Sequence, residues 1–244
     1  GYMLLLLLGF IVLGIVLFLI FKSKTIQGSN HQPVEKAPQP SSPKVESQQP
    51  ILIEKTRAEI LGQEGEQLFI QQYQQAFTLP YVLLDNYTFT DAKNGTTQVD
   101  HIILSLNGIF VIELKNYSGW VFGKKDQKQW TQIVYQKKYQ FQNPLRQNYK
   151  HIKVLENILA DLVEFKHLNS LVIFTEKSEF KTEMPNNVLQ GRAWIDYVKQ
   201  ARQPIFSTLE LQVIHSRLEQ ARLADNADTD YLHVQNLRNK RPTI

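Results

Sequence analysis

Three charged residues, Asp100, Glu113 and Lys115, are of types that together could support metal-assisted chemistry on a phosphate. Two carboxylates that lie close together repel each other, and one pKa rises unless a cation lies between them. Carboxylate oxygens suit Mg²⁺ or Mn²⁺, and such an ion acts as a Lewis acid and lowers the pKa of its bound water. A neighbouring lysine could orient that water and offset the charge of a transferring phosphate.

The segments that carry these residues are expected to form a β-hairpin. Residues 98–106 and 109–115 are strongly strand-like, and Asn107-Gly108 between them is the best short-range signal for a two-residue turn. With that turn, Asp100 pairs with Lys115. Paired side chains share a face of the sheet, as do residues two apart, so the three charged side chains should converge. A slip of one residue would separate them.

A simpler interpretation of the same residues is structural. Asp100 and Lys115 could form a cross-strand ion pair, with Glu113 solvated at the end of its strand. An aspartate followed after twelve residues by Glu-Leu-Lys is a short and common pattern. The spacing alone therefore leaves both interpretations open.

Longer stretches around these residues resemble a known family. Asp100 with Glu113-Leu114-Lys115 resembles the signature of the PD-(D/E)xK nucleases. Four stretches, in this order along the chain, look like the motifs of the NERD (nuclease-related domain) family: Gly62–Glu66, Gln98–His101, Gly108–Asn116 with Gly119, and Asn143–Gln147. Four ordered stretches are far more specific than the short pattern.

The resemblance implies a fold and a site. The fold would be α/β, a restriction-endonuclease-like mixed sheet core flanked by helices, over residues 51–202. Asp100 and Glu113 would hold the metal, with Glu66 as an additional acidic ligand from the first helix. Lys115 would be the catalytic lysine, and Gln147 would orient water or a phosphate. Glu66 could instead be a surface residue, and Gln147 could cap or pack the first turn of its helix.

A basic stretch follows the Glu-Leu-Lys strand. Between Val121 and Lys153 there are seven lysines and one arginine against one aspartate, so this segment carries +7 in a chain of formal net charge +4. Basic groups neutralise phosphates and aromatic rings stack on bases, so the backbone of a nucleic acid, DNA rather than RNA, is expected here. An ordinary solvated surface is the alternative, and most of the interleaved aromatic residues are expected in the core. The predicted nucleic-acid contacts are Lys124, Lys125, Lys128, Arg146 and Lys150.

Hydrophobic periodicity places helices around these strands. Helices are expected at 54–77, at 144–165, after residue 190 through Tyr197, and from a capping box of Ser207 and Glu210 to about residue 223. Further strands are expected at 81–84, 87–89, 130–135, 139–141, 171–175 and 188–190. Strands mixed with helices indicate an α/β or α+β fold.

The first 50 residues are interpreted as an anchor and a tether. Residues 3–21 carry no charge, and as a helix they would measure about 28 Å, close to the roughly 30 Å of hydrocarbon in a bilayer. No basic residue precedes this run and no cleavage motif follows it, so residues 1–22 are predicted to be a transmembrane anchor rather than a cleaved signal peptide. Residues 23–50 hold half of the ten prolines and read as a flexible linker. Two lysines directly after the anchor place the globular part in the cytoplasm, at the inner or plasma membrane.

The sequence therefore predicts a membrane-anchored nuclease that depends on Mg²⁺ or Mn²⁺ and hydrolyses phosphodiester bonds in DNA, with a C-terminal helix and tail at 203–244. Two alternatives keep the fold without the reaction: a non-catalytic nucleic-acid-binding module and a protein-interaction module. The chain has no cysteine, which excludes disulfides, thiolate metal sites and a cysteine nucleophile. It also lacks a phosphate-binding loop, a Rossmann glycine fingerprint and a nucleophile elbow. The oligomeric state is not indicated.

Overall fold

The computed structural model describes residues 56–92, 95–200 and 203–224 of the 244-residue chain. The predicted anchor and linker lie outside the described residues, as does the tail after residue 224. Across the described ranges, no helix combines the length and the apolar character needed to cross a membrane.

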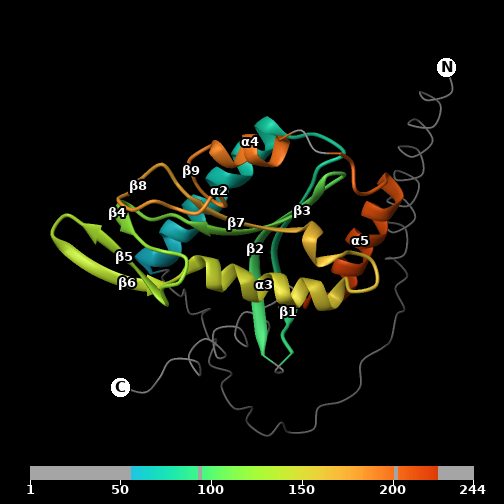
Figure 1. Cartoon of the computed structure of the whole chain (residues 1–244), viewed down its shortest axis with the longest axis horizontal. Coiled ribbons are helices and arrows are strands. Elements are labelled where there is room, and N and C mark those ends of the chain that lie inside the picture. Colours follow the sequence, from blue (N-terminus) through green and yellow to red (C-terminus); the bar gives the residue numbers. More distant parts are fainter. Residues whose placement is uncertain (1–55, 93–94, 201–202, 225–244) are drawn as a thin grey trace, which may run out of the picture. The chain divides into compact units, whose positions relative to one another are not determined.

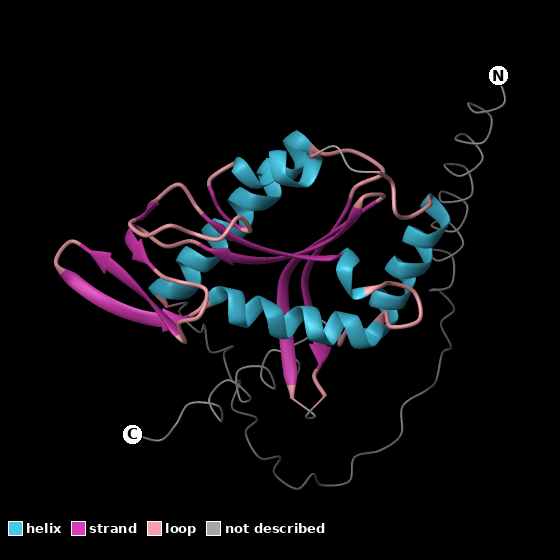
Figure 2. Ribbon diagram, viewed as in Figure 1, coloured by secondary structure: helices cyan, strands magenta, loops and turns pink. Residues whose placement is uncertain are grey.

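The described chain forms a mixed α/β domain in which two mixed sheets are flanked by helices (Figure 1, Figure 2). The elements, in chain order, are α2 (Arg57–Ala76), β1 (Val82–Thr90), β2 (Thr96–Ser105), β3 (Gly108–Lys115), β4 (Gly119–Phe122), β5 (Gln129–Val134), β6 (Lys137–Gln142), α3 (Pro144–Ile158), a 3₁₀ turn η1 (Phe165–His167), β7 (Leu168–Phe174), β8 (Ser178–Phe180), β9 (Val188–Gln190), α4 (Ala193–Lys199) and α5 (Thr208–Ala221).

The larger sheet has five strands in the order β1-β2-β3-β7-β9. Strands β1 to β3 are antiparallel, whereas β7 and β9 run parallel to β3 and to each other. Helices α3 and α5 pack on the sheet face that carries Ile102 and Val111, while α2 and α4 pack on the face that carries Ile103 and Phe110. Because side chains alternate along a strand, the apolar runs of β2 and β3 fill both cores at once.

The turn between β2 and β3 lies one residue earlier than predicted, which shifts the pairing of the two strands by two residues. Ser105 pairs with Gly108, so residues 106–107 form the turn and the predicted Asn107-Gly108 turn is wrong. The Ser105 hydroxyl donates to the Gly108 carbonyl and accepts from the Asn107 N–H, and Gly108 has a φ of 143°, which favours glycine. A shift of two residues, unlike a shift of one, leaves every side chain on its expected face.

The smaller sheet has the order β6-β5-β4-β8. Its strands β5 and β6 form the expected hairpin, whereas β4 and β8 have only four and three residues and were not predicted from the sequence. Trp130 and Phe174 stack at its base, with Phe141 at their edge. This cluster joins the smaller sheet to β7.

Several predicted boundaries change in the structure. The helix predicted at 144–165 ends at Ile158, and the two strands predicted at 81–84 and 87–89 are the single strand β1. The capping box of Ser207 and Glu210 is confirmed at the start of α5. Helix α5 packs its buried side chains into the same core as α3.

Candidate active site

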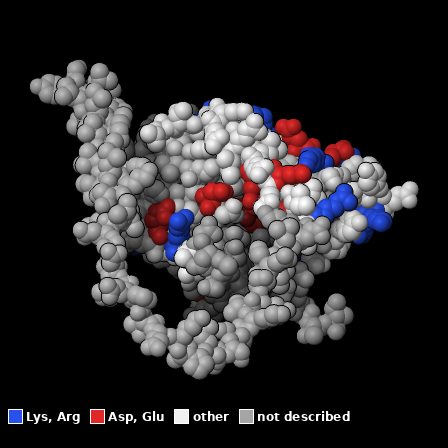
Figure 3. Space-filling model, turned by 180° about the vertical axis from the view of Figure 1, so that it is seen from behind, with Lys and Arg blue, Asp and Glu red and all other residues white. Residues whose placement is uncertain are grey.

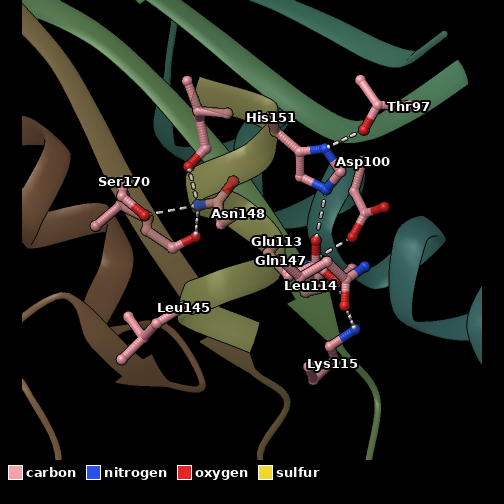
Figure 4. Close-up of polar contacts among 12 residues, drawn as sticks. Thr97, Asp100, Glu113, Leu114, Lys115, Leu145, Gln147, Asn148, His151 and Ser170 are labelled. Atoms are coloured by element: carbon pink, nitrogen blue, oxygen red, sulfur yellow. Dashed lines mark hydrogen bonds and ion pairs between the residues drawn. The ribbon is translucent and has the colours of Figure 1, made fainter. Parts of the chain in front are cut away.

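The structure brings Asp100, Glu113 and Lys115 together where β2 and β3 leave the core (Figure 4). The last pair of β2 and β3 at this end is His101 with Ile112. The next position in the same register sets Asp100 opposite Glu113, rather than opposite Lys115 as predicted. Asp100 Oδ2 accepts the backbone N–H of Leu114 at 2.8 Å, and Lys115 Nζ donates to Glu113 Oε1. The three side chains therefore converge as predicted, although the partner of Asp100 across the strands is different.

Helix α3 supplies two further side chains to this group. Lys115 Nζ donates to Gln147 Oε1 at 3.2 Å, so the predicted glutamine is in place. One turn further along, His151 Nε2 lies 3.1 Å from Glu113 Oε2. No motif or metal-ligand spacing in the sequence marks His151 as a site residue. Its position four residues after Gln147 was the available signal, because residues i and i+4 share a helix face.

The roles of the two ring nitrogens of His151 follow from its partners. Its Nδ1 lies 2.8 Å from the hydroxyl oxygen of Thr97, on β2. An ionised carboxylate can only accept, so Nε2 donates to Glu113. In the neutral ring Nδ1 then accepts from Thr97. The chain Thr97–His151–Glu113 fixes the orientation of a carboxylate that is only 1% exposed.

Two buried asparagines hold α3 against the sheet. Asn143 caps the helix by accepting the Leu145 N–H at 3.0 Å, and Pro144 occupies the first turn, where a missing N–H has no consequence. The side-chain amide of Asn148 donates to the carbonyls of Val111 and Leu171 at 2.8 and 3.0 Å. The two bonds of Asn148 join α3 to β3 and β7, so they place Gln147 and His151 over the end of β3.

Burial and neighbouring charges set the protonation of the three charged residues. Burial raises the pKa of Glu113, but the Lys115 ammonium and His151 outweigh it, so that pKa lies below its ordinary value. Burial lowers the pKa of Lys115, but Glu113 and Asp100 outweigh it, so that pKa lies above its ordinary value. Burial and Glu113 raise the pKa of Asp100 to about 6, against the lowering effect of Lys115. At neutral pH the group thus holds two carboxylates and one ammonium.

This arrangement fits a small divalent cation. Asp100 Oδ2 is hydrogen-bonded, whereas its Oδ1 has no hydrogen-bond partner among the described residues. The unfavourable ionisation of Asp100 beside Glu113 is what a cation would relieve. Mg²⁺ commonly binds one or two carboxylates and keeps several waters, so Asp100 and Glu113 are the residues that would hold it.

The structure does not assemble the expected triad with Glu66. Within the described ranges, no group of three or more His, Asp or Glu side chains is arranged to hold a metal. Glu66 instead accepts from Asn86 Nδ2 at 3.4 Å. Helix α2 lies on the opposite sheet face from Glu113, which explains the separation. Asn86 lies between Asp85 and Tyr87, which pair with His101 and Val99, so Glu66 contacts the β1 position that flanks Asp100.

Four of the five predicted nucleic-acid contacts line one groove beside α3. Lys125, Lys128, Arg146 and Lys150 surround an open volume of about 690 Å³. Lys124 lines a neighbouring hollow of about 430 Å³. On a helix with 3.6 residues per turn, Lys150 and Arg146 lie about 60° and 100° around the axis from Gln147. The groove residues of α3 therefore lie on the helix surface adjacent to the one that carries Gln147, which contacts Lys115.

The basic loop between β4 and β5 is fastened to the start of α3. Asn143 Nδ2 donates to the carbonyls of Lys125 and Gln127 at 3.1 and 2.7 Å, and Arg146 donates to the carbonyl of Asp126 at 2.8 Å. Trp130 Nε1 donates to the carbonyl of Lys124 at 2.9 Å. These bonds use main-chain groups, so the lysine side chains of the loop remain exposed.

The aromatic residues of this region are more exposed than predicted. Between Trp120 and Lys153 there are seven Phe, Trp and Tyr residues, expected mostly in the core, and four of them are exposed: Trp120, Tyr135, Tyr139 and Tyr149. Tyr149 lines the basic groove, whereas the other three lie on the smaller sheet and its turn. One face of the smaller sheet is open to solvent, so aromatic side chains on that face stay exposed instead of entering the core.

Two comparisons with known proteins identify the family. The profile described as nuclease-related domain, NERD, matches residues 61–175, which include β2, β3, β7 and α3. An uncharacterized protein of Bacillus anthracis is 32% identical over 186 residues, which cover 73% of this chain and 84% of the relative. The chain belongs to the nuclease-related domain family, and the site described above lies inside the matched residues.

Proposed function

We propose that this domain is a nuclease that hydrolyses phosphodiester bonds, in DNA rather than RNA, with Mg²⁺ or Mn²⁺ held by Asp100 and Glu113. The observation that carries the proposal is the meeting of two carboxylates and one lysine ammonium, contacted by a helix, α3, that also lines a basic groove. Membership of a nuclease-related family supports it. A bound ion would supply Lewis acidity and would lower the pKa of a coordinated water.

Lys115 acts as a charge and a hydrogen-bond donor in this proposal. Because its pKa is raised, the ammonium is protonated at neutral pH and is a poor general base. It donates to Glu113 and Gln147 and can direct its remaining N–H toward a phosphate oxygen. Gln147 accepts from Lys115 through Oε1, which leaves its amide N–H groups for a water or a phosphate. His151 holds Glu113 in place.

Glu66 remains in the proposal as an additional acidic ligand. It is connected through Asn86 to the β1 position that flanks Asp100. The groove residues Lys125, Lys128, Arg146 and Lys150, with Lys124 beside them, would contact the phosphates on the way to the site.

We also propose that residues 3–21 anchor the chain in the inner or plasma membrane and that residues 23–50 tether the domain on the cytoplasmic side. The uncharged apolar run and the lysines that follow it support this proposal.

The test compares the full chain, purified in a non-ionic detergent, with Lys115→Ala and Asp100→Asn variants. Circular and linear DNA are incubated with each protein in Mg²⁺, Mn²⁺ or EDTA. The proposal expects cleavage by the wild type and none by Lys115→Ala or Asp100→Asn, and no cleavage by any protein in EDTA. A Lys166→Ala variant is the matched control, because Lys166 is exposed and lies beyond the far end of α3. Binding without cleavage by any of the proteins would assign a binding module instead, and loss of binding as well would favour a protein-interaction module.

A further inference from the structure

The β5–β6 hairpin extends outward from the smaller sheet (Figure 1). Val134 pairs with Lys137, so Tyr135 and Gln136 form a two-residue turn. Tyr135 is 97% exposed, and its φ of 55° lies in the left-handed region. Turns of this length ordinarily have Gly, Asn or Asp at such a position, because other side chains are strained there. Tyr135 is therefore a bulky residue with a strained backbone and an exposed ring, and it has no packing role in the described domain. Residues with a strained backbone cluster at functional sites.

The hairpin is also basic. It contains Lys137 and Lys138, and there is no acidic residue from Gln129 to Gln142. Both lysines are exposed, and Tyr139 beside them is 49% exposed. Figure 3 shows Lys and Arg side chains at the end of the domain from which the hairpin extends, at the right in that view. A positive surface with accessible rings is complementary to nucleic acid rather than to an acidic peptide, because stacking needs flat partners.

One face of β6 runs from the basic groove to the turn. Gln142 lines the groove, and Gln140 and Lys138 lie on the same face of the strand as Gln142, since side chains alternate. At about 3.3 Å per residue, Lys138 lies roughly 13 Å beyond Gln142. The hairpin therefore continues the groove, and Tyr135 stands past its outer end.

We propose that the β5–β6 hairpin is a second binding surface for the nucleic-acid substrate, on which an unpaired base stacks against Tyr135 while Lys137 and Lys138 contact the adjoining phosphates. A base inside a duplex already has both faces stacked on its neighbours, so the ring selects a single strand or an overhang. This inference rests on the proposed function, since it supposes that the groove leads a nucleic acid to the site.

Binding is measured in EDTA, so that it does not depend on cleavage. The full chain in detergent is titrated against fluorescein-labelled DNA in three forms: a single strand, a blunt duplex and a duplex with an overhang. Tyr135→Ala is expected to weaken binding of the single strand and the overhang about tenfold, within the range for one base stacked on an aromatic ring. Binding of the blunt duplex should change less than about twofold, and Tyr135→Phe should bind like the wild type because it keeps the ring.

The lysines are tested through the salt dependence of binding. Each phosphate contact to a single strand contributes about 0.7 to the slope of log affinity against log salt. The double variant Lys137→Ala with Lys138→Ala should therefore lower the slope by about 1.4, whereas Lys166→Ala should leave it unchanged.

Two results would overturn the inference: equal binding of all three DNA forms by Tyr135→Ala and the wild type, or a Tyr135→Phe variant as weak as Tyr135→Ala. Failure of the inference is distinguishable from failure of the proposed function. Normal cleavage with no effect of Tyr135 rejects the hairpin alone. Binding that depends on Tyr135 in a protein that never cleaves DNA rejects the nuclease and keeps the hairpin.

Discussion

Asp100 has a carboxyl group whose pKa is raised from 3.8 to about 6 by burial and by Glu113. Between those pH values the unfolded chain is ionised while the folded chain keeps the proton, so folded stability falls as the pH rises through this window. We expect Asp100→Asn to raise the free energy of unfolding by about 1–2 kcal/mol at neutral pH in EDTA, and by much less near pH 4. Urea unfolding at both pH values measures this. A gain of equal size at both would show that charge is not the cause.

His151 carries the second prediction among single residues. Without its ring, Glu113 Oε2 and the Thr97 hydroxyl lose their common partner. Residues that orient a metal-binding side chain typically contribute about 10- to 100-fold to metal affinity or activity. We expect His151→Ala to lower DNA cleavage by this factor and to raise the Mn²⁺ concentration needed for half-maximal rate. Thr97→Val should show a smaller effect of the same kind. Wild-type metal dependence in both variants would leave His151 with a packing role only.

The sequence predicted the residues of the site better than their contacts. Asp100, Glu113, Lys115 and Gln147 meet as expected, because strand alternation and helix periodicity decide which side chains share a face. His151 was missed because it forms no pattern with the other histidines, and its partner Glu113 lies on a strand distant in the chain. Glu66 is set apart from the carboxylates by the packing of its helix, which periodicity cannot determine.

Among the elements, the loop between β4 and β5 depends on one buried side chain. Asn143 both caps α3 and donates to the carbonyls of Lys125 and Gln127. We expect Asn143→Ala to lower the free energy of unfolding by about 2–4 kcal/mol, because it removes a helix cap and leaves partly buried loop carbonyls without their donor. Binding of duplex DNA should also weaken, since the loop lysines lose their fixed positions.

Asn143→Asp is the control for this prediction. It keeps the oxygen that caps the helix but loses the N–H groups that hold the loop. Thermal unfolding and duplex binding of both variants would be measured together. If Asn143→Asp bound DNA like the wild type, the loop would not need this anchor, and the effect of Asn143→Ala would belong to the helix alone.

Strand pairing shows where element-level prediction failed. Asn107-Gly108 is the preferred turn in isolation, yet Ser105 pairs with Gly108 and its hydroxyl closes the turn. The short strand β8 escaped detection because its strand partner is β4, more than fifty residues away in the chain, while β4 itself has only four residues. The propensities of neighbouring residues do not predict parallel pairing between strands so far apart in the chain.

At the scale of the whole molecule, burial of both sheet faces explains why the layered core was predictable. Strands that read as continuous apolar runs require a cover on each side, and amphipathic helices were available on both sides of them in the sequence. The role of α5 was not predictable from its motif. Its buried side chains Leu211, Ile214 and Leu218 pack with α3, so the helix predicted after residue 203 closes the core that carries the site.

The last prediction concerns how the whole chain is placed in a cell. If residues 3–21 span a bilayer, the full chain should sediment with membranes and resist carbonate extraction. A double variant, Val12→Lys with Leu13→Lys, should release it, because each lysine at a helix centre costs about 2.5–3.5 kcal/mol on insertion. The exchange Val12→Leu with Leu13→Val is the matched control and should stay bound. Release of the wild type by carbonate would contradict a spanning helix, and the nuclease proposal would stand without it because the site lies in residues 97–151.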